Sequence, residues 1–241
     1  MCITTRIEVD AASGSGSPRV VTASGALQVR RLREHDSTVR LALVAGQALL
    51  LAGDQVRVEV QVYGPVQIEI VETAGTVAYD MRGGAARWEV EIDLRGRAAL
   101  IWDGQPFVVS AGADVRRETV VALEDGCRSE LRETIVLGRA GELGGSVRTD
   151  SRIHFAGQPL LVEELDLSVQ ARAGWATLHG HRCLDTVTTA GHRLPDGPGV
   201  LQLEGTGSIH RWIGDELHLA RPPITRASPQ LSGSSGPAPS R

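Results

Sequence analysis

Hydrophobic and polar residues alternate along most of this chain with a period of two. In the run 56–62 every second residue is valine, and Arg57, Glu59 and Gln61 stand between the valines. Side chains at i and i+2 of a strand share a face, so the run predicts a strand with one buried face. The alternation returns in residues 66–71, 88–94, 148–155 and 160–167.

Turn residues separate these runs at intervals of about eight to twelve residues, which is typical of an all-β sandwich, barrel or solenoid rather than of βαβ units. Gly64-Pro65 is predicted to join two runs as a hairpin. No run after residue 20 keeps a period of 3.6, so we expect few short helices, near 185–190 or 213–219. No strict sequence repeat is visible, so the pattern alone does not establish a regular solenoid.

The ends of the chain differ from its middle. Residues 11–18 are small, polar or Pro, and residues 222–241 are rich in Pro, Ser and Gly. We therefore expect a flexible segment at 1–20 and a disordered tail at 222–241. One β domain should fill 21–221, and its part 175–221, where the alternation weakens, should be a diverged extension packed on the main sheets.

Composition excludes several functions. Aromatic residues make up 3% of the chain and the formal charge is −4, so the chain lacks both stacking platforms and a basic footprint for nucleic acid. The core must be aliphatic. All 25 cationic residues are arginine. A chain without lysine has no Walker A loop, no Schiff-base lysine and no Ser-x-x-Lys nucleophile.

Three cysteines, Cys2, Cys127 and Cys183, do not form a disulfide framework. The N-terminal residues lack the apolar core of a signal peptide. The longest apolar run, 41–53, is interrupted by Gln47 and is shorter than the roughly 20 residues that span a bilayer. We predict a soluble protein in the reducing cytoplasm, with no membrane partner.

His179, His181 and Cys183 are the sharpest cluster of candidate metal ligands. If this stretch is a strand, the two imidazoles and the thiol share a face and form a ligand set for Ni, Zn or Cu. The alternative is a strand with a buried cysteine and solvated or backbone-bonded histidines. A complete site also requires a further ligand.

Glu133 is expected on the same strand face as Leu131 and Ile135. A carboxylate in that position is either paired with an arginine, placed at a protein interface, or partly exposed at a sheet edge. Elsewhere the chain has no Gly-x-Ser-x-Gly elbow, and no catalytic residues are predicted.

Three segments carry a family resemblance. Residues 45–54 form an apolar, glycine-containing run that ends in Gly-Asp before the valine strand, and residues 79–94 hold a tyrosine, a glycine pair and an alternating strand. The most specific segment is 130–142, with Gly-Arg at 138–139 and Gly-Glu at 141–142. Together they resemble the UreD (UreH) family of urease accessory proteins over roughly residues 24–170.

The chain departs from that family in two places. Residues 71–76 replace a Thr-Thr-Gln-type segment, and the part after Gly174 lacks the family's C-terminal helical stretch. Residues 209–215 look like a remnant of the family's final region.

The resemblance implies a mainly β, solenoid-like fold and a non-catalytic role. It implies binding to the urease apoprotein subunits and to the accessory proteins UreF and UreG, so that nickel reaches the urease active site. It implies no resident cofactor, only transient nickel. Glu133, Gly138 and Arg139 become candidates for a partner interface.

Two rival functions remain open from the residues alone. A metal-binding β-fold enzyme or cupin-like protein would use His179, His181 and Cys183, and would require at least three converging ligands and a pocket. A carbohydrate-binding module is disfavoured because the aromatic residues are few and scattered.

Overall fold

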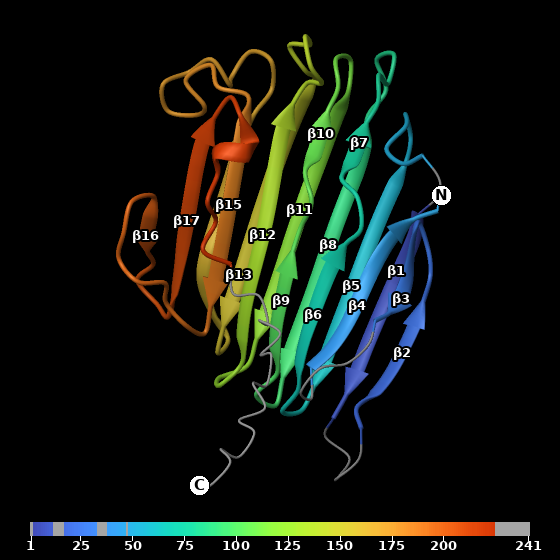
Figure 1. Ribbon diagram of the computed structural model, residues 1–241, viewed down its shortest axis with the longest axis vertical. Helices are drawn as coiled ribbons and strands as arrows, with labels where there is room; N and C mark the ends of the chain where they lie inside the picture. The colour runs from blue at the N-terminus through green and yellow to red at the C-terminus, as the bar shows by residue number, and fades with distance from the viewer. Residues whose placement is uncertain (1, 12–16, 33–37, 47, 225–241) are drawn as a thin grey trace, which may run out of the picture.

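The computed structural model describes residues 2–11, 17–32, 38–46 and 48–224. Two facing sheets contain all the strands of this part of the chain (Figure 1). Sheet A has the strand order β14-β13-β11-β8-β5-β1-β2. Its strands are β1 Cys2–Asp10, β2 Arg19–Ala23, β5 Gln55–Tyr63, β8 Ala86–Arg95, β11 Asp114–Leu123, β13 Ser146–Phe155 and β14 Gln158–Asp166.

Sheet B has the strand order β16-β17-β15-β12-β9-β6-β4-β3, and two short strands extend it, β10 beside β12 and β7 beside β10. A single 3-10 turn, η1 (Leu217–Leu219), is the only helical element among the described residues. The strands of sheet B are β3 Leu27–Arg31, β4 Thr38–Ala45, β6 Gln67–Glu72, β7 Thr76–Ala78, β9 Ala99–Asp103, β10 Phe107–Val109, β12 Arg128–Leu137, β15 Cys183–Ala190, β16 Val200–Gln202 and β17 Gly207–Gly214.

The chain winds between the two sheets as a β-solenoid of about four turns. From β4 to β13 it crosses from one sheet to the other and back, and successive strands within each sheet are parallel. Gln55 lies beside Arg87, and Arg87 beside Arg116, so one coil takes roughly 30 residues. The predicted all-β, solenoid-like fold with few helices is confirmed.

The predicted hairpin at Gly64-Pro65 is wrong. β5 belongs to sheet A and β6 to sheet B, so the turn carries the chain across the core instead of reversing it within one sheet. Alternation in both strands specifies only that one face is buried. A hairpin and a coil bury the same positions, so the pattern could not separate them.

The coils differ in the continuity of their sheet B strand, which explains the lack of a sequence repeat. In two coils this strand is broken into β6 and β7, or β9 and β10, whereas β12 is continuous. Gly104, in the second break, has no room for a side chain, because a Cβ there would lie 2.4 Å from the carbonyl oxygen of Arg132.

Antiparallel strands complete both ends of the solenoid. β2 and β3 flank the N-terminal coils, and β14, β15 and β17 extend the sheets beyond β13 and β12. Of the two short helices that the sequence predicts, 185–190 is instead part of β15, where Asp185, Val187 and Thr189 are all buried. Of the other predicted helix, 213–219, only the residues of η1 are helical.

The prediction of a flexible segment at 1–20 is wrong for residues 2–10. They form β1, which pairs with β5 on one side and β2 on the other. Thr5, Ile7 and Val9 are buried and alternate with Arg6 and Glu8, which is the same signal that identifies the other strands. Residues 12–16 and the greater part of the predicted tail, 225–241, lie outside the described residues.

The core between the sheets is aliphatic, as the composition requires. Fully buried Leu41, Ile70 and Leu100 of sheet B face the valines of β5 and Ile92 of β8. Trp88 meets Phe107 edge to face, with ring centroids 5.8 Å apart. Within the described residues no helix is long and apolar enough to cross a membrane.

Candidate functional site

The interior of the solenoid changes from aliphatic to polar along its axis. Val58 of β5 lies beside Val90 of β8, and the same register continues to Thr119 of β11 and Ser151 of β13. Two aliphatic coils are therefore followed by two polar ones. We call this region the polar seam and define it by Glu72, Arg117, Thr119, Glu133, Thr149, Ser151, Glu163 and Arg211.

An ion pair between the sheets forms the centre of the polar seam. Arg117 of β11 donates through Nη2 to Oε1 of Glu133 on β12 at 2.9 Å, and the hydroxyl of Thr119 donates to the same oxygen at 3.1 Å. The guanidinium carbon of Arg117 lies 4.5 Å from the Phe107 ring centroid. Among the alternatives for Glu133, pairing with an arginine is the arrangement that the structure contains.

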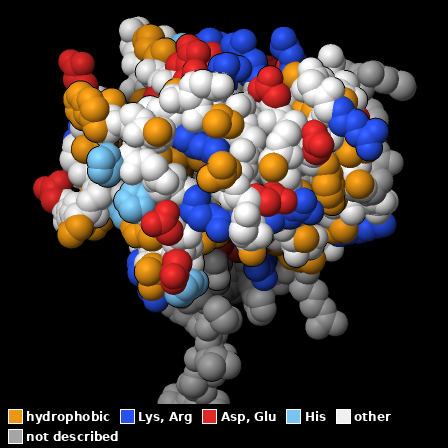
Figure 2. All heavy atoms as spheres, turned by 90° about the horizontal axis from the view of Figure 1, so that it is seen from above, with side chains coloured by type: hydrophobic (Ala, Val, Ile, Leu, Met, Phe, Trp, Pro, Cys, Tyr) orange, Lys and Arg blue, Asp and Glu red, His pale blue; other side chains and the backbone are white. Residues whose placement is uncertain are grey.

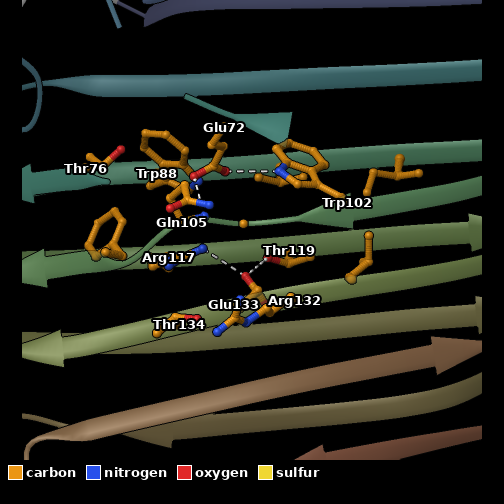
Figure 3. A pocket seen from close by; sticks show the side chains of 15 residues that line it. Glu72, Thr76, Trp88, Trp102, Gln105, Arg117, Thr119, Arg132, Glu133 and Thr134 are labelled. Carbon is orange, nitrogen blue, oxygen red and sulfur yellow. Dashed lines mark hydrogen bonds and ion pairs between the residues drawn. The ribbon is translucent and has the colours of Figure 1, made fainter. Parts of the chain in front are cut away.

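Glu72 provides a second carboxylate where β6 breaks. It accepts hydrogen bonds from Nε1 of Trp102 and from the backbone N–H of Gln105, both at 3.0 Å (Figure 3). Burial raises the pKa of Glu72 above its usual range despite these donors. Glu72, Arg117 and Glu133 line a cavity of ≈ 30 Å³, which has room for ordered water.

A second cavity of ≈ 30 Å³ continues the polar seam towards the C-terminal strands and shares Arg117 and Glu133 with the first. At its far side Arg211 of β17 binds Glu163 of β14 through two hydrogen bonds, of 2.7 and 3.1 Å. This fork links the two sheets beyond the last coil. Because Glu133 and Glu163 each face an arginine, the seam is suited to holding water and polar groups.

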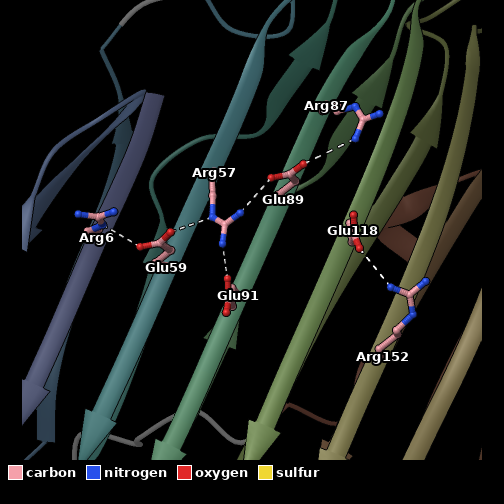
Figure 4. A network of polar contacts seen from close by, with 8 residues as sticks. All are labelled: Arg6, Arg57, Glu59, Arg87, Glu89, Glu91, Glu118 and Arg152. Carbon is pink, nitrogen blue, oxygen red and sulfur yellow. Dashed lines mark hydrogen bonds and ion pairs between the residues drawn. The ribbon is translucent and has the colours of Figure 1, made fainter. Parts of the chain in front are cut away.

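The outer face of sheet A carries a connected set of ion pairs (Figure 4). Arg57 bonds Glu59 at 2.8 Å and also bonds Glu91, while Arg6 bonds Glu59 at 2.7 Å. These side chains are 23% to 67% exposed, so the pairs contribute little to stability. This face is a charged surface open to solvent.

The outer side of sheet B instead holds buried charges. Arg132 bonds Asp185 at 2.9 Å and Asp103 at 3.2 Å, and Thr134 donates to Asp185 at 2.5 Å. Asp185 is completely buried. Such a cluster fixes the pairing of β9, β12 and β15, because removing one partner leaves an unpaired buried charge.

The loops that follow β4, β7, β10, β12, β14 and β17 gather at one end of the solenoid, which we call the loop end (Figure 1). A view onto this end shows hydrophobic side chains next to charged ones (Figure 2). Large apolar side chains are exposed in its loops at Leu51, Tyr79, Leu143, Val169, Trp175 and Leu219.

The three candidate metal ligands do not share a strand face. β15 begins only at Cys183, and His179 lies in the preceding turn with φ +50°. His181 places Nδ1 3.0 Å from Oδ2 of Asp215, and burial raises the pKa of the Cys183 thiol. Across the described residues no three His, Cys, Asp or Glu side chains are placed to hold a metal ion. Metal binding by His179, His181 and Cys183 stays a prediction.

Gly138 and Arg139 begin a tightly built loop after β12. Gly138 has φ +84°, and a Cβ there would lie 2.5 Å from the carbonyl oxygen of Glu142. Arg139 binds the Glu142 carboxylate at 2.6 Å, and that carboxylate also accepts the backbone N–H groups of Arg139 and Ala111. These bonds lower the pKa of Glu142 to about 2. The Gly-Arg and Gly-Glu pairs of the motif thus build the loop, and an interface role for Gly138 and Arg139 stays a prediction.

Comparison with known proteins agrees with this architecture. The family model described as UreD urease accessory protein matches residues 4–222. The chain belongs to the UreD family. Urease accessory protein UreD 1 of Streptomyces griseus is 43% identical over 208 residues, covering 85% of this chain and 82% of that protein. UreD of Streptomyces avermitilis is 32% identical over 214 residues, covering 87% and 84%.

A further UreD protein, UreD 2 of Saccharopolyspora erythraea, is 30% identical over 227 residues, covering 92% of this chain and 71% of its own. The resemblance inferred from the three segments is therefore confirmed, and it extends well beyond residues 24–170. UreD accessory proteins are non-enzymatic scaffolds of urease maturation, so the prediction of a non-catalytic protein is confirmed.

The sequence did not identify Glu72, Arg117, Glu163 or Arg211 as parts of one site. Their partners lie far away along the chain: Arg211 meets Glu163 across 48 positions. One signal was available, because Arg117 and Thr119 take inward positions in a strand whose other inward residues, Val115 and Val121, are apolar.

Proposed function

We propose that this protein is a scaffold in urease maturation that binds the urease apoprotein and the accessory proteins UreF and UreG, so that nickel can be inserted into the urease active site. The family match over residues 4–222 is the observation that carries the proposal. The protein performs no reaction itself, and GTP hydrolysis belongs to its partner UreG.

The architecture supports this role. The solenoid is stiff, because its coils are joined by continuous parallel pairing and cross-linked by Arg117 and Glu133. It presents two different surfaces, the charged outer face of sheet A and the partly apolar loop end. Exposed apolar side chains beside charges are typical of surfaces that bind other proteins.

The test is deletion of the gene in its host, followed by assay of urease activity and of the nickel content of purified urease. We expect urease without nickel and without activity, and restoration of both by the wild-type gene. Tagged protein should recover urease subunits or UreF from the native host. Fully active, nickel-loaded urease in the deletion strain would contradict the proposal.

A further inference from the structure

Three arginines form a row across the outer face of sheet A. Arg87 of β8 lies beside Arg116 of β11, and Arg116 lies beside Arg148 of β13. Their side chains are 55%, 54% and 50% exposed. Neighbouring strands are about 4.8 Å apart, so the three charges extend over about 10 Å. Like charges in adjacent positions of a sheet oppose its formation, so the fold gives no reason for the row.

The row forms only long ion pairs within its own sheet. Its nearest carboxylates are those of Glu89, Asp150 and Asp166, at 4.0, 3.7 and 3.7 Å, and Asp114 also lies 3.9 Å from Arg148. These distances are too long for hydrogen bonds. Each of the three guanidinium groups keeps several donors that face solvent.

The acidic residues next to the row also pair with arginines outside it. Arg152 binds Asp150 at 2.6 Å. Arg152 also binds Glu118 at 3.2 Å, and Glu89 lies 3.5 Å from Arg57 as well as 4.0 Å from Arg87 (Figure 4). Sheet A therefore carries a band of arginines held only by long ion pairs, next to a band of acids that form shorter ones. The arginine band lies at the starts of its strands, along the border of the loop end.

We infer that this arginine row binds an acidic α-helix of a maturation partner, an inference that rests on the proposed function. A helix rises about 5.4 Å per turn, close to the strand spacing of about 4.8 Å, so one carboxylate per turn at i, i+4 and i+7 can meet all three arginines. Side chains on one face of an extended strand are about 6.7 Å apart, so the third carboxylate of a bound strand would lie beyond the third arginine. Guanidinium forks bind carboxylates in bidentate geometry.

The acidic band limits the width of the ligand. An anionic surface wider than one helix would also cover Glu89, Glu118 and Asp150 and would be repelled. A helix with an acidic stripe flanked by basic residues matches both bands. A nucleic-acid backbone or an anionic bilayer complements the charge of the arginine row but not that of the acidic band.

A binding experiment with the full chain tests this pairing. The probe is a labelled helical peptide with glutamates at i, i+4 and i+7 and lysines along the flanks. Its reference is an isomer with the same residues spread around the helix. The wild type should bind the striped peptide about tenfold more tightly than the isomer, because three ion pairs are formed together. Added salt should weaken this preference.

The triple variant Arg87→Gln, Arg116→Gln, Arg148→Gln should lose the preference. The matched control, Arg19→Gln, Arg30→Gln, Arg128→Gln, removes the same charge from exposed arginines elsewhere and should keep it. Thermal unfolding shows whether each variant is folded, and Arg116→Gln alone replaces the triple variant if that variant is not. Equal binding of both peptides by the wild type would overturn the inference, as would tight binding to RNA or phosphatidylglycerol vesicles but not to the striped peptide.

Complementation of the deletion strain separates the two proposals. Urease activity in the strain that carries the triple variant should be lower than in the strain that carries the control variant, by about tenfold or more. If it restores full activity while the empty strain has none, the arginine row is not the docking site and the scaffold function stands. If the empty strain already has active urease, the proposed function fails whatever the peptides show.

Discussion

The first and last coils of the solenoid share one backbone plan but have different interiors. Between β5, β8 and the facing strands of sheet B, the inward residues are mainly valine, isoleucine and leucine, together with Trp88 and Trp102. Between β11, β13, β12 and β15 the corresponding positions hold Arg117, Thr119, Glu133 and Ser151. The comparison teaches that register and burial are set by the aliphatic coils. The polar coils continue the same backbone arrangement and accommodate hydrophilic side chains inside it.

The largest effect is expected in the aliphatic coils. Ile70 is fully buried, and Ile70→Ala should lower the free energy of unfolding by about 3 kcal/mol, through lost burial and the cavity that remains. Chemical denaturation measures this loss. Ile70→Val is the matched control and should cost about 1 kcal/mol. An Ile70→Ala protein as stable as the wild type would mean that the aliphatic coils do not set the fold.

The polar seam should respond differently to single and double changes. Glu133→Ala leaves Arg117 largely buried without its partner and should cost roughly 1–3 kcal/mol, below the value for a fully buried pair because Glu133 is 31% exposed. Replacing both residues by apolar ones of similar size, Arg117→Met with Glu133→Leu, should restore most of that stability. If the double variant were less stable than Glu133→Ala, the pair itself would stabilise the seam.

Glu72 should make stability depend on pH. Its folded pKa is raised above the unfolded value of about 4.5, so the folded protein keeps the proton after the unfolded chain has lost it. The free energy of unfolding should therefore fall as pH rises above about 4.5. Glu72→Gln should flatten this slope, whereas the exposed-site control Glu164→Gln should leave it as in the wild type. Denaturation at a series of pH values compares the three proteins.

The smallest effect is expected at the loop after β12. Glu142 has a pKa of about 2, below its ordinary value, so its bonds hold at neutral pH and are lost as pH falls towards 2. Glu142→Gln should speed hydrogen exchange at the amides of Arg139 and Ala111 without changing exchange in β12. Faster exchange throughout β12 would show that the loop supports the strand as well.

The strands were predictable because each buries one face, and the alternation of β5 and β8 records this directly. Their assignment to sheets was not, since Val58 and Ile68 are buried alike whether their strands form a hairpin or a coil. β1 has the same alternation, but the small and polar residues that follow it led to the prediction of a flexible segment there. In the polar seam the unusual carboxylate Glu133 was evident, but its partner Arg117 depends on how β11 faces β12.

The position of β1 also has a consequence during biosynthesis. Ile7 pairs beside Val60 of β5, so the strand made first has no parallel partner until roughly fifty more residues have been added. At translation rates of about 5–20 residues per second this delay is about 3–10 s. Throughout it the apolar side of β1 is open to chaperones and to other nascent chains, so slow translation before β5 should favour aggregation.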